Sequence, residues 1–141
     1  MSFQLHPQLQ RDCIALGEFQ LCQLLVVNDS QYPWFMLVPQ KPEIKEIFQL
    51  SPAERAVLME ESCTLAENLK IMFQGDKINI AAIGNLVPQL HIHHVVRYQT
   101  DNAWPAPIWG KFPAIPYSPM QLTDLSMKVR QQLGDKLKYY A

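Results

Sequence analysis

The sequence predicts an α+β protein in which an antiparallel sheet is packed with a long helix and followed by a C-terminal helix. Three observations predict this class. Apolar runs of strand length come in two pairs, a strongly signalled helix separates the pairs, and a second capped helix follows them. The order hairpin, helix, two strands, helix is typical of an antiparallel sheet covered on one face.

The N-terminal third predicts a short helix and then a hairpin. Residues 5–14 can form a helix with Pro7 in its first turn. Residues 19–27 first alternate and then become fully apolar, as a strand does when it enters a core. Residues 28–33 have the composition of a turn, and 34–38 form a second apolar strand. We therefore expect an antiparallel hairpin whose loop is longer than two residues.

The long helix has clear start and stop signals. Ser51 can cap it, Pro52 suits its first position, and Glu54 completes a capping box. The helix should run to about Phe73, and Gly75 should stop it. One apolar stripe predicts the face that packs on the sheet. Its members are Val57, Leu58, Leu65, Leu69 and Met72.

The remaining chain predicts two strands, an irregular segment and a helix. Residues 77–83 form a strand, and 84–88 form the loop into a second strand over 89–97. Residues 98–117 are rich in proline and aromatic residues, so we expect an ordered but irregular segment. Residues 118–134 repeat the capping signature and should form the C-terminal helix.

Composition limits the function classes. The chain has 141 residues, 48% of them hydrophobic, and a net charge of −1, so we expect one domain and no nucleic-acid partner. No apolar run is long enough to cross a membrane, and the N-terminus lacks the features of a signal peptide. The three cysteines form no metal-binding pair and predict reduced thiols in a cytoplasmic protein.

The segment 89–97 holds three of the four histidines. On a strand, His91 and His93 would share one face with Gln89, about 7 Å apart at their Cα atoms, while His94 takes the other face. Two adjacent imidazoles can supply a nucleophile or a metal site, although a histidine pair on a strand is often structural. We expect a solvated His6, a partly buried or interfacial His94, and a Trp34 that belongs to the core.

A nucleophile and a metal site make different demands on the neighbouring residues. A neutral imidazole attacks phosphorus when one nitrogen is free and the other gives its proton to an acceptor, here a backbone carbonyl. The phosphoryl oxygens need N–H donors, which the amides of 84–86 can supply. A metal site would need a carboxylate, and none occurs in the strand or its loops before Asp101. We therefore expect no metal and no cofactor.

These residues resemble the histidine-triad (HIT) superfamily. Residues 84–97 follow its motif His-φ-His-φ-His-φ-φ, where φ is apolar, and segments 25–29 and 35–39 and the capped helix extend the resemblance over about 18–97. Residues 104–110 are similar to a segment of a bacterial HIT subgroup. The resemblance implies a single HIT-like domain over 1–141. It would have about five strands, a core at about 18–97 and a C-terminal extension at 98–141.

The resemblance also implies residue roles. His91 would be the nucleophile that accepts a nucleoside monophosphate, and His93 would assist at the phosphate. Asn85 and the amide of Leu86 would bind phosphate, and Asn28 would hold the ribose hydroxyls. The apolar residues implied for the base pocket are Leu25, Val27 and Phe35.

The sequence departs from the family motif at three positions. Gln89 replaces the first histidine, His94 replaces an apolar residue, and Leu86 replaces a serine that donates to phosphate in some relatives. Glutamine cannot carry an imidazolium charge, so we expect weaker proton handling. Gln89→His should then raise turnover of nucleotides with poor leaving groups.

The implied function is a nucleotide-binding hydrolase of phosphoric esters or anhydrides, or a nucleotidyl transferase. It would act through a nucleoside monophosphate linked to histidine on a small-molecule nucleotide substrate. The alternative is a nucleotide-binding module with little or no turnover. Relatives pair through the long helix and the adjoining sheet edge, so we also expect a homodimer.

Overall fold

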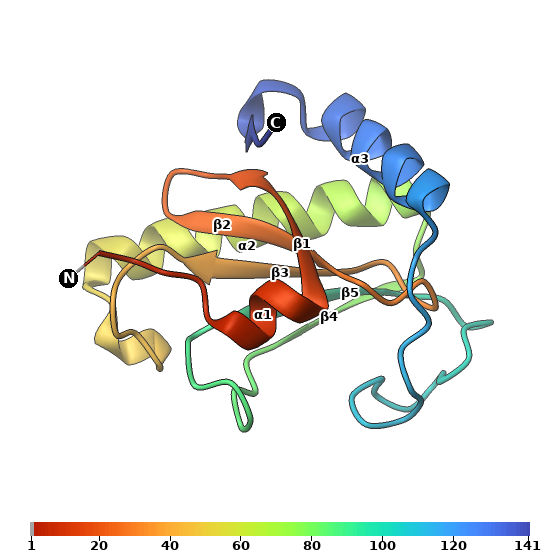
Figure 1. Ribbon diagram of the computed structural model, residues 1–141, viewed down its shortest axis with the longest axis horizontal. Helices are drawn as coiled ribbons and strands as arrows, with labels where there is room; N and C mark the ends of the chain where they lie inside the picture. Colours follow the sequence, from red (N-terminus) through yellow and green to blue (C-terminus); the bar gives the residue numbers. More distant parts are fainter. Residues whose placement is uncertain (1) are drawn as a thin grey trace.

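The computed structural model describes residues 2–141 and contains one antiparallel six-stranded sheet with the strand order β4-β5-β3-β2-β1-β6 (Figure 1). The fold class is the predicted α+β. The helices are α1 (Pro7–Asp12), α2 (Pro52–Phe73) and α3 (Pro119–Leu133), with short 3-10 turns η1 (Ile47–Gln49) and η2 (Gly134–Lys136). The strands are β1 (Cys13–Glu18), β2 (Cys22–Val27), β3 (Trp34–Pro39), β4 (Lys77–Ala81), β5 (Ile92–Arg97) and β6 (Lys138–Tyr139).

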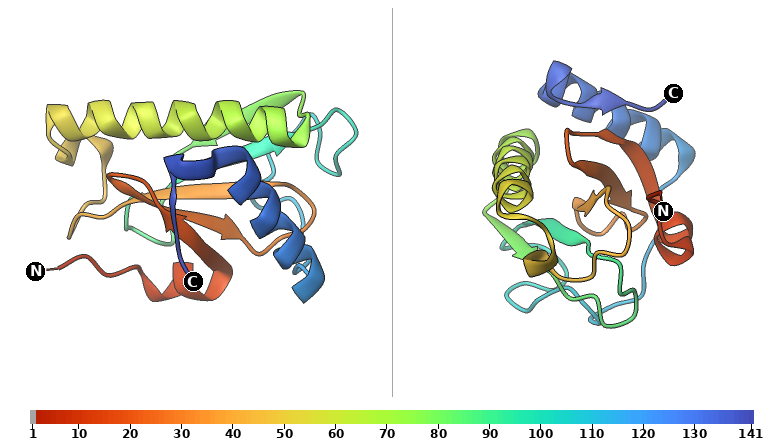
Figure 2. Two further views of the ribbon diagram at one scale, coloured as in Figure 1. Left: turned by 90° about the horizontal axis from the view of Figure 1, so that it is seen from above. Right: turned by 90° about the vertical axis from the view of Figure 1, so that its left-hand side faces the viewer.

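The sheet lies between two unequal layers. Helix α2 covers one face and α1 lies against the other, as Figure 2 shows from above. Along β3 the alternate side chains divide accordingly: Phe35 and Leu37 join the core under α2 and α3, whereas Met36 and Val38 pack with Leu9 of α1. The layer formed by α1 is therefore the thinner one, and the sheet face beneath it carries the candidate site.

Local signals set the long helix as predicted. The Ser51 hydroxyl accepts from the N–H of Glu54, and the Glu54 carboxylate accepts from the N–H of Ser51, so the capping box is complete. The helix ends at Phe73 with Gln74 in the left-handed region, and the N–H of Gly75 returns to the carbonyl of Lys70. Both predicted boundaries are confirmed.

The N-terminal prediction is wrong in part. The short helix ends at Asp12, and Cys13 begins β1, a strand that the sequence analysis did not anticipate. Strand β1 pairs with β2 on one side and with β6 on the other, which gives six strands instead of about five. Gly17 permits the second pairing, because a Cβ there would lie 2.4 Å from the carbonyl oxygen of Lys138.

The histidine strand is shorter than predicted. It begins at Ile92, so Gln89 and His91 lie in the connection that enters β5 rather than in the strand. Strand β5 pairs with both β3 and β4 and lies inside the sheet. Beyond it, Arg97 forms a buried pair with Asp101, at 2.8 and 3.0 Å, that anchors the irregular segment 98–117.

Candidate active site

His91 and His93 meet at the entry of β5. Their ring centroids lie 5.0 Å apart with an interplanar angle of 72°. Nδ1 of His91 lies 2.7 Å from the backbone oxygen of Gln89. A carbonyl oxygen can only accept, so Nδ1 of His91 carries the proton and Nε2 of the neutral ring keeps its lone pair.

A cavity of about 750 Å³ opens over the two rings on the face of the sheet opposite α2. Leu9, Val27 and Met36 give it an apolar wall. Such a volume, with a few polar groups at one end, is typical of a small-molecule site. The other residues that line it include His6, Gln8, Asp12, Trp34, Ile83, Val87, Trp109 and Gly110.

The loop before β5 forms one side of the cavity. Gly84, Asn85 and Leu86 all line it, and Gly84 adopts a left-handed φ of +65°, which favours glycine. Among the hydrogen bonds within residues 2–141, none uses the N–H of Asn85 or Leu86. Leu86 is 96% exposed, and its side chain has no hydrogen-bond donor, so only its backbone N–H could donate to a phosphate.

Two tryptophans surround His93. The indole N–H of Trp34 donates to Nδ1 of His93 at 3.0 Å, and the ring of Trp109 packs edge-on against His93 at 5.3 Å. Burial, and then the neighbouring His91 and His94, lower the pKa of His93 to about 3. The sequence analysis assigned Trp34 to the core and gave Trp109 no role.

The Gln89 side chain does not share the face of His91 and His93. Its Oε1 accepts from the N–H of His6 at 2.9 Å, and its Nε2 donates to the carbonyl of Gln4 at 2.9 Å. The strand begins only at Ile92, so the alternation that predicted a common face does not extend back to Gln89. Gln89 serves His91 through its backbone oxygen alone.

The other predicted binding residues separate into two groups. Val27 lines the cavity, and Leu25 is fully buried behind it on the same face. Phe35 is not part of the cavity, because the alternation of β3 turns it toward α2, where its ring lies 6.1 Å from that of Phe73. Asn28 follows Val27, and its Oδ1 accepts from the N–H of Tyr117 at 2.9 Å.

His6 is half-buried, so the expectation of a solvated side chain holds only in part. Its Nδ1 accepts from the N–H of Gln8 at 3.0 Å and caps α1, and the residue lines the cavity together with Gln8 and Asp12. The bond from its backbone N–H to Gln89 brings it there. A contact between residues 83 positions apart leaves no periodic signal in the sequence.

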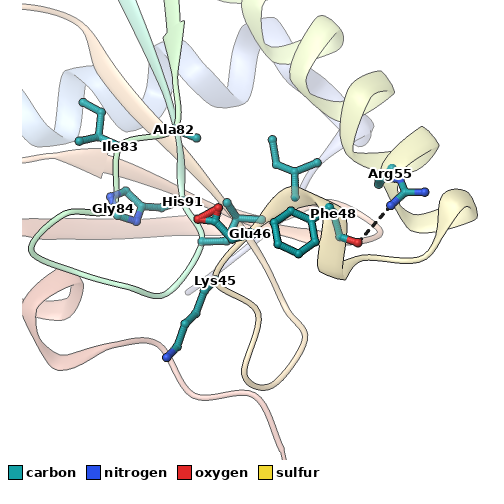
Figure 3. Close-up of a pocket in the computed structure, with 10 residues that line it drawn as sticks. Lys45, Glu46, Phe48, Arg55, Ala82, Ile83, Gly84 and His91 are labelled. Atoms are coloured by element: carbon teal, nitrogen blue, oxygen red, sulfur yellow. Dashed lines mark hydrogen bonds between the residues drawn. The ribbon is translucent and has the colours of Figure 1, made fainter.

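A second hollow, of about 490 Å³, reaches His91 from the side of η1. Figure 3 shows His91 beside Gly84, with Glu46 and Phe48 of the η1 segment facing it. Arg55 borders this hollow but is held by the carbonyls of Phe48 and Leu50. Ile83, Gly84 and His91 line both spaces, so the histidine stands where they meet.

His94 points away from the cavity, as predicted, and is completely buried beneath α2. Its Nδ1 donates to the carbonyl of Ile92 at 3.0 Å, and its Nε2 lies 2.7 Å from the hydroxyl of Ser62. Burial lowers its pKa to about 4, against a smaller opposite effect of the bond to Ile92. His94 is therefore a neutral link between the sheet and the long helix.

Within residues 2–141, no three His, Cys, Asp or Glu side chains are grouped closely enough to hold a metal ion. Over the same residues, no helix has the length and apolar character needed to span a membrane.

The chain is similar to known proteins of one family. Residues 8–100 match the HIT domain. A histidine triad protein from Marinobacter aquaeolei VT8 is 46% identical, with a TM-score of 0.93 over 96% of this chain and 98% of that one. A histidine triad (HIT) protein from Sinorhizobium meliloti 1021 is 40% identical, with a TM-score of 0.91 over 93% and 97%. A histidine triad protein from Bradyrhizobium japonicum is 38% identical, with a TM-score of 0.91 over 94% and 98%. No curated protein matches the chain at a significant level.

The antiparallel sheet, the histidine pair and the open cavity define an α+β protein with a candidate small-molecule site. The chain belongs to the HIT domain family, whose members are generally nucleotide-binding hydrolases or transferases.

Proposed function

We propose that this protein hydrolyses phosphoric esters or anhydrides of nucleotides, or transfers the nucleotidyl group, through a nucleoside monophosphate linked to His91. The arrangement of His91 carries the proposal. Its Nδ1 proton is held by the oxygen of Gln89 at 2.7 Å, which leaves Nε2 as a nucleophile in a cavity large enough for a nucleotide. His93 lies beside it at the position expected to assist at the phosphate.

The reaction has two steps. Nε2 of His91 attacks phosphorus, an N–P bond forms, and the bond to the leaving group breaks. The leaving group departs with the electron pair and takes a proton from solvent. Water or another acceptor then attacks phosphorus, the electron pair returns to Nε2, and the proton of the acceptor passes to solvent. His93 and the amides of Asn85 and Leu86 stabilise the charge on the phosphoryl oxygens.

The remaining cavity suits the nucleoside. The space runs from His91 to α1, where Leu9 and Val27 offer an apolar surface to a base. Leu25 supports this wall from behind. The proposal keeps the predicted ribose contact of Asn28, because its Oδ1 binds Tyr117 while no hydrogen bond within residues 2–141 uses its Nδ2.

A second candidate function is nucleotide binding with little turnover. One observation favours it. Gln89, at the first motif position, is not ionisable, and its side chain binds the N-terminal segment instead of facing the cavity. In that case the cavity would bind a nucleotide, but His91 would form no covalent bond to its phosphorus.

The test compares wild type and His91→Ala on a panel of nucleotides with anhydride, ester and phosphoramidate leaving groups. We expect wild type to turn over at least one substrate, and His91→Ala to lose several powers of ten in rate while remaining folded. Rapid quenching and mass measurement should show one added nucleoside monophosphate on wild type only. Nucleotide binding without label or turnover would favour the binding module, and near-wild-type turnover by His91→Ala would exclude the covalent mechanism.

The proposal includes a cytoplasmic homodimer, with one domain over 1–141 and no nucleic-acid partner. The three cysteines are all free, and the net charge of −1 offers no basic field for a polyanion. Fractionation of cells and a salt-controlled assay with DNA and RNA test these two points.

A further inference from the structure

The indole of Trp34 determines which nitrogen of His93 carries the proton. Its N–H donates to Nδ1 of His93 at 3.0 Å. An indole N–H can only donate, so Nδ1 must be the bare nitrogen, and the proton of the neutral ring lies on Nε2. We propose that Trp34 is a positioning residue that holds His93 as its Nε2–H tautomer, so that His93 presents a fixed hydrogen-bond donor to the phosphoryl group.

The sheet brings the two residues together. Strands β3 and β5 pair so that Trp34 lies opposite Val95 and Met36 lies opposite His93. Trp34 and His93 are thus diagonal neighbours on the cavity face, at a separation that a large aromatic ring can bridge. Their ring centroids lie 5.8 Å apart with an interplanar angle of 40°.

Trp109 shows that this bond is more than aromatic packing. Its ring is even closer to that of His93, at 5.3 Å, yet its Nε1 is buried and has no hydrogen-bond partner within residues 2–141. Both tryptophans cover the histidine, and only Trp34 directs its N–H at a ring nitrogen. The chain therefore contains its own control for the effect of packing alone.

The tautomer makes His93 complementary to His91. His91 has its proton on Nδ1 and a lone pair on Nε2, which suits attack on phosphorus. His93 has the reverse arrangement, which suits donation to a phosphoryl oxygen, whereas a bare Nε2 would repel that oxygen. The lowered pKa of His93 agrees with this role, because only the neutral imidazole has two tautomers.

Nitrogen NMR tests the tautomer directly in the free protein labelled with ¹⁵N at histidine and tryptophan. At pH 7 we expect a proton on Nε2 of His93 and a scalar coupling between Nε1 of Trp34 and Nδ1 of His93. Trp34→Phe should remove the coupling and shift both ring nitrogens toward the average of the two tautomers. Trp109→Phe, the matched control, should leave the His93 tautomer as it is. A proton on Nδ1 in wild type, or unchanged His93 signals in Trp34→Phe, would overturn the proposal. If Trp34→Phe does not fold, the wild-type coupling decides.

Turnover supplies a second readout, which rests on the proposed function. Deleting an oxyanion donor costs about a hundred- to a thousand-fold in kcat, so we expect that loss for His93→Ala and a smaller one, about ten-fold, for Trp34→Phe. Because Trp34 acts through His93, Trp34→Phe should add almost nothing in the His93→Ala background. Fully additive losses would contradict a role through His93. The NMR measurement needs no nucleotide, so the two tests are independent. A protein without turnover would contradict the proposed function, while the NMR data would still decide the tautomer of His93.

Discussion

Gln89 occupies the first position of the motif, which implies a role in proton transfer, but its side chain binds the N-terminal segment instead. Both ends of its amide bind backbone, the oxygen at His6 and the nitrogen at Gln4. These bonds hold the N-terminal segment, and with it the start of α1, against the cavity. We therefore infer that the glutamine positions a wall of the site and takes no part in proton transfer.

The first prediction replaces the expectation, made from the motif, that Gln89 tunes proton transfer. Gln89→Ala removes one part-buried and one exposed hydrogen bond, and should weaken nucleotide binding by about 1–2 kcal/mol, roughly five- to thirty-fold. The loss should be equal for good and poor leaving groups. Titration calorimetry and steady-state rates measure both. Gln89→Glu, which keeps the acceptor for His6 but opposes the carbonyl of Gln4, should fall between. A loss confined to poor leaving groups would restore the proton-transfer role.

The second prediction concerns Asn28. Asn28→Ala should weaken nucleotide binding by about 1–3 kcal/mol, because it removes the predicted ribose contact. A nucleotide without ribose hydroxyls should show no further loss in this variant, and competition binding with the two ligands measures the difference. Asn28→Asp keeps the acceptor that Tyr117 uses and controls for that structural bond. An equal additional loss for the hydroxyl-free ligand would remove Asn28 from the ribose site.

At the scale of elements, the site depends on how β5 is tied to its surroundings. His94 joins β5 to Ser62 of α2 on one face, while His93 joins it to Trp34 of β3 on the other. Consecutive residues on a strand point to opposite faces, so one short segment can contact both the covering helix and the cavity face.

The third prediction is that folding stability falls as pH is lowered from 6.5 to 5. The pKa values of His93 and His94 are lowered, to about 3 and about 4, from an ordinary value of 6.5. In this window the unfolded chain binds protons that the folded chain refuses, so stability is complete above pH 6.5 and is lost below it. Each histidine contributes up to about 1.4 kcal/mol per pH unit.

Urea unfolding at pH 7.5, 6.5, 5.5 and 5 measures this dependence. His94→Gln should be less stable at pH 7.5, because a buried bond is lost, but its stability should fall about half as steeply with pH. This window lies above the ordinary pKa of carboxyl groups, so Asp101 does not contribute: burial raises its pKa, but hydrogen bonds from Arg97 and from backbone N–H groups together lower it. A slope that is the same in both proteins would show that His94 is not responsible.

At the scale of the whole molecule, the C-terminal segment shares the core of the HIT domain. Leu125, Val129 and Leu133 of α3 pack in the same cluster as Leu65 and Leu69 of α2. The chain should therefore unfold in one cooperative transition, as expected for a single domain.

The fourth prediction is a homodimer formed through the β4 edge. Strand β4 ends the sheet, Ile80 on it is 51% exposed, and α2, which leads into it, exposes Met59 and Ile71. A free edge with apolar side chains needs covering. Light scattering at micromolar concentration should give twice the chain mass.

Two charge substitutions make the dimer test specific. Ile80→Lys should produce a folded monomer, because a lysine at a strand edge opposes pairing. Met120→Lys changes an equally apolar and more exposed side chain, at 75%, on α3 away from that edge, and should leave the dimer intact. A monomeric wild type, or dissociation by both substitutions, would contradict an interface at β4.

Local signals in the sequence were sufficient for the two long helices and for the presence of the hairpin. A capping box and a proline act within four residues, so the starts of α2 and α3 could be read directly. The motif also placed His91 and His93 side by side, because the two residues are only two positions apart. The carbonyl of Gln89 that orients the His91 ring is equally close in sequence. Strand β1 was missed because it is stabilised by pairing with distant segments. One of its partners, β6, lies more than a hundred residues away in the sequence.

The sequence by itself therefore determined the fold class, the long helix and the histidine pair, whose causes are short-range. The tertiary structure alone decided where Gln89 and Phe35 point, that His6 lines the cavity, and that Trp34 bonds His93. Each of these depends on strand register or on a contact between distant segments. A side chain's direction on a strand changes with a shift of one residue, so no local pattern can set it until the partner strand is known.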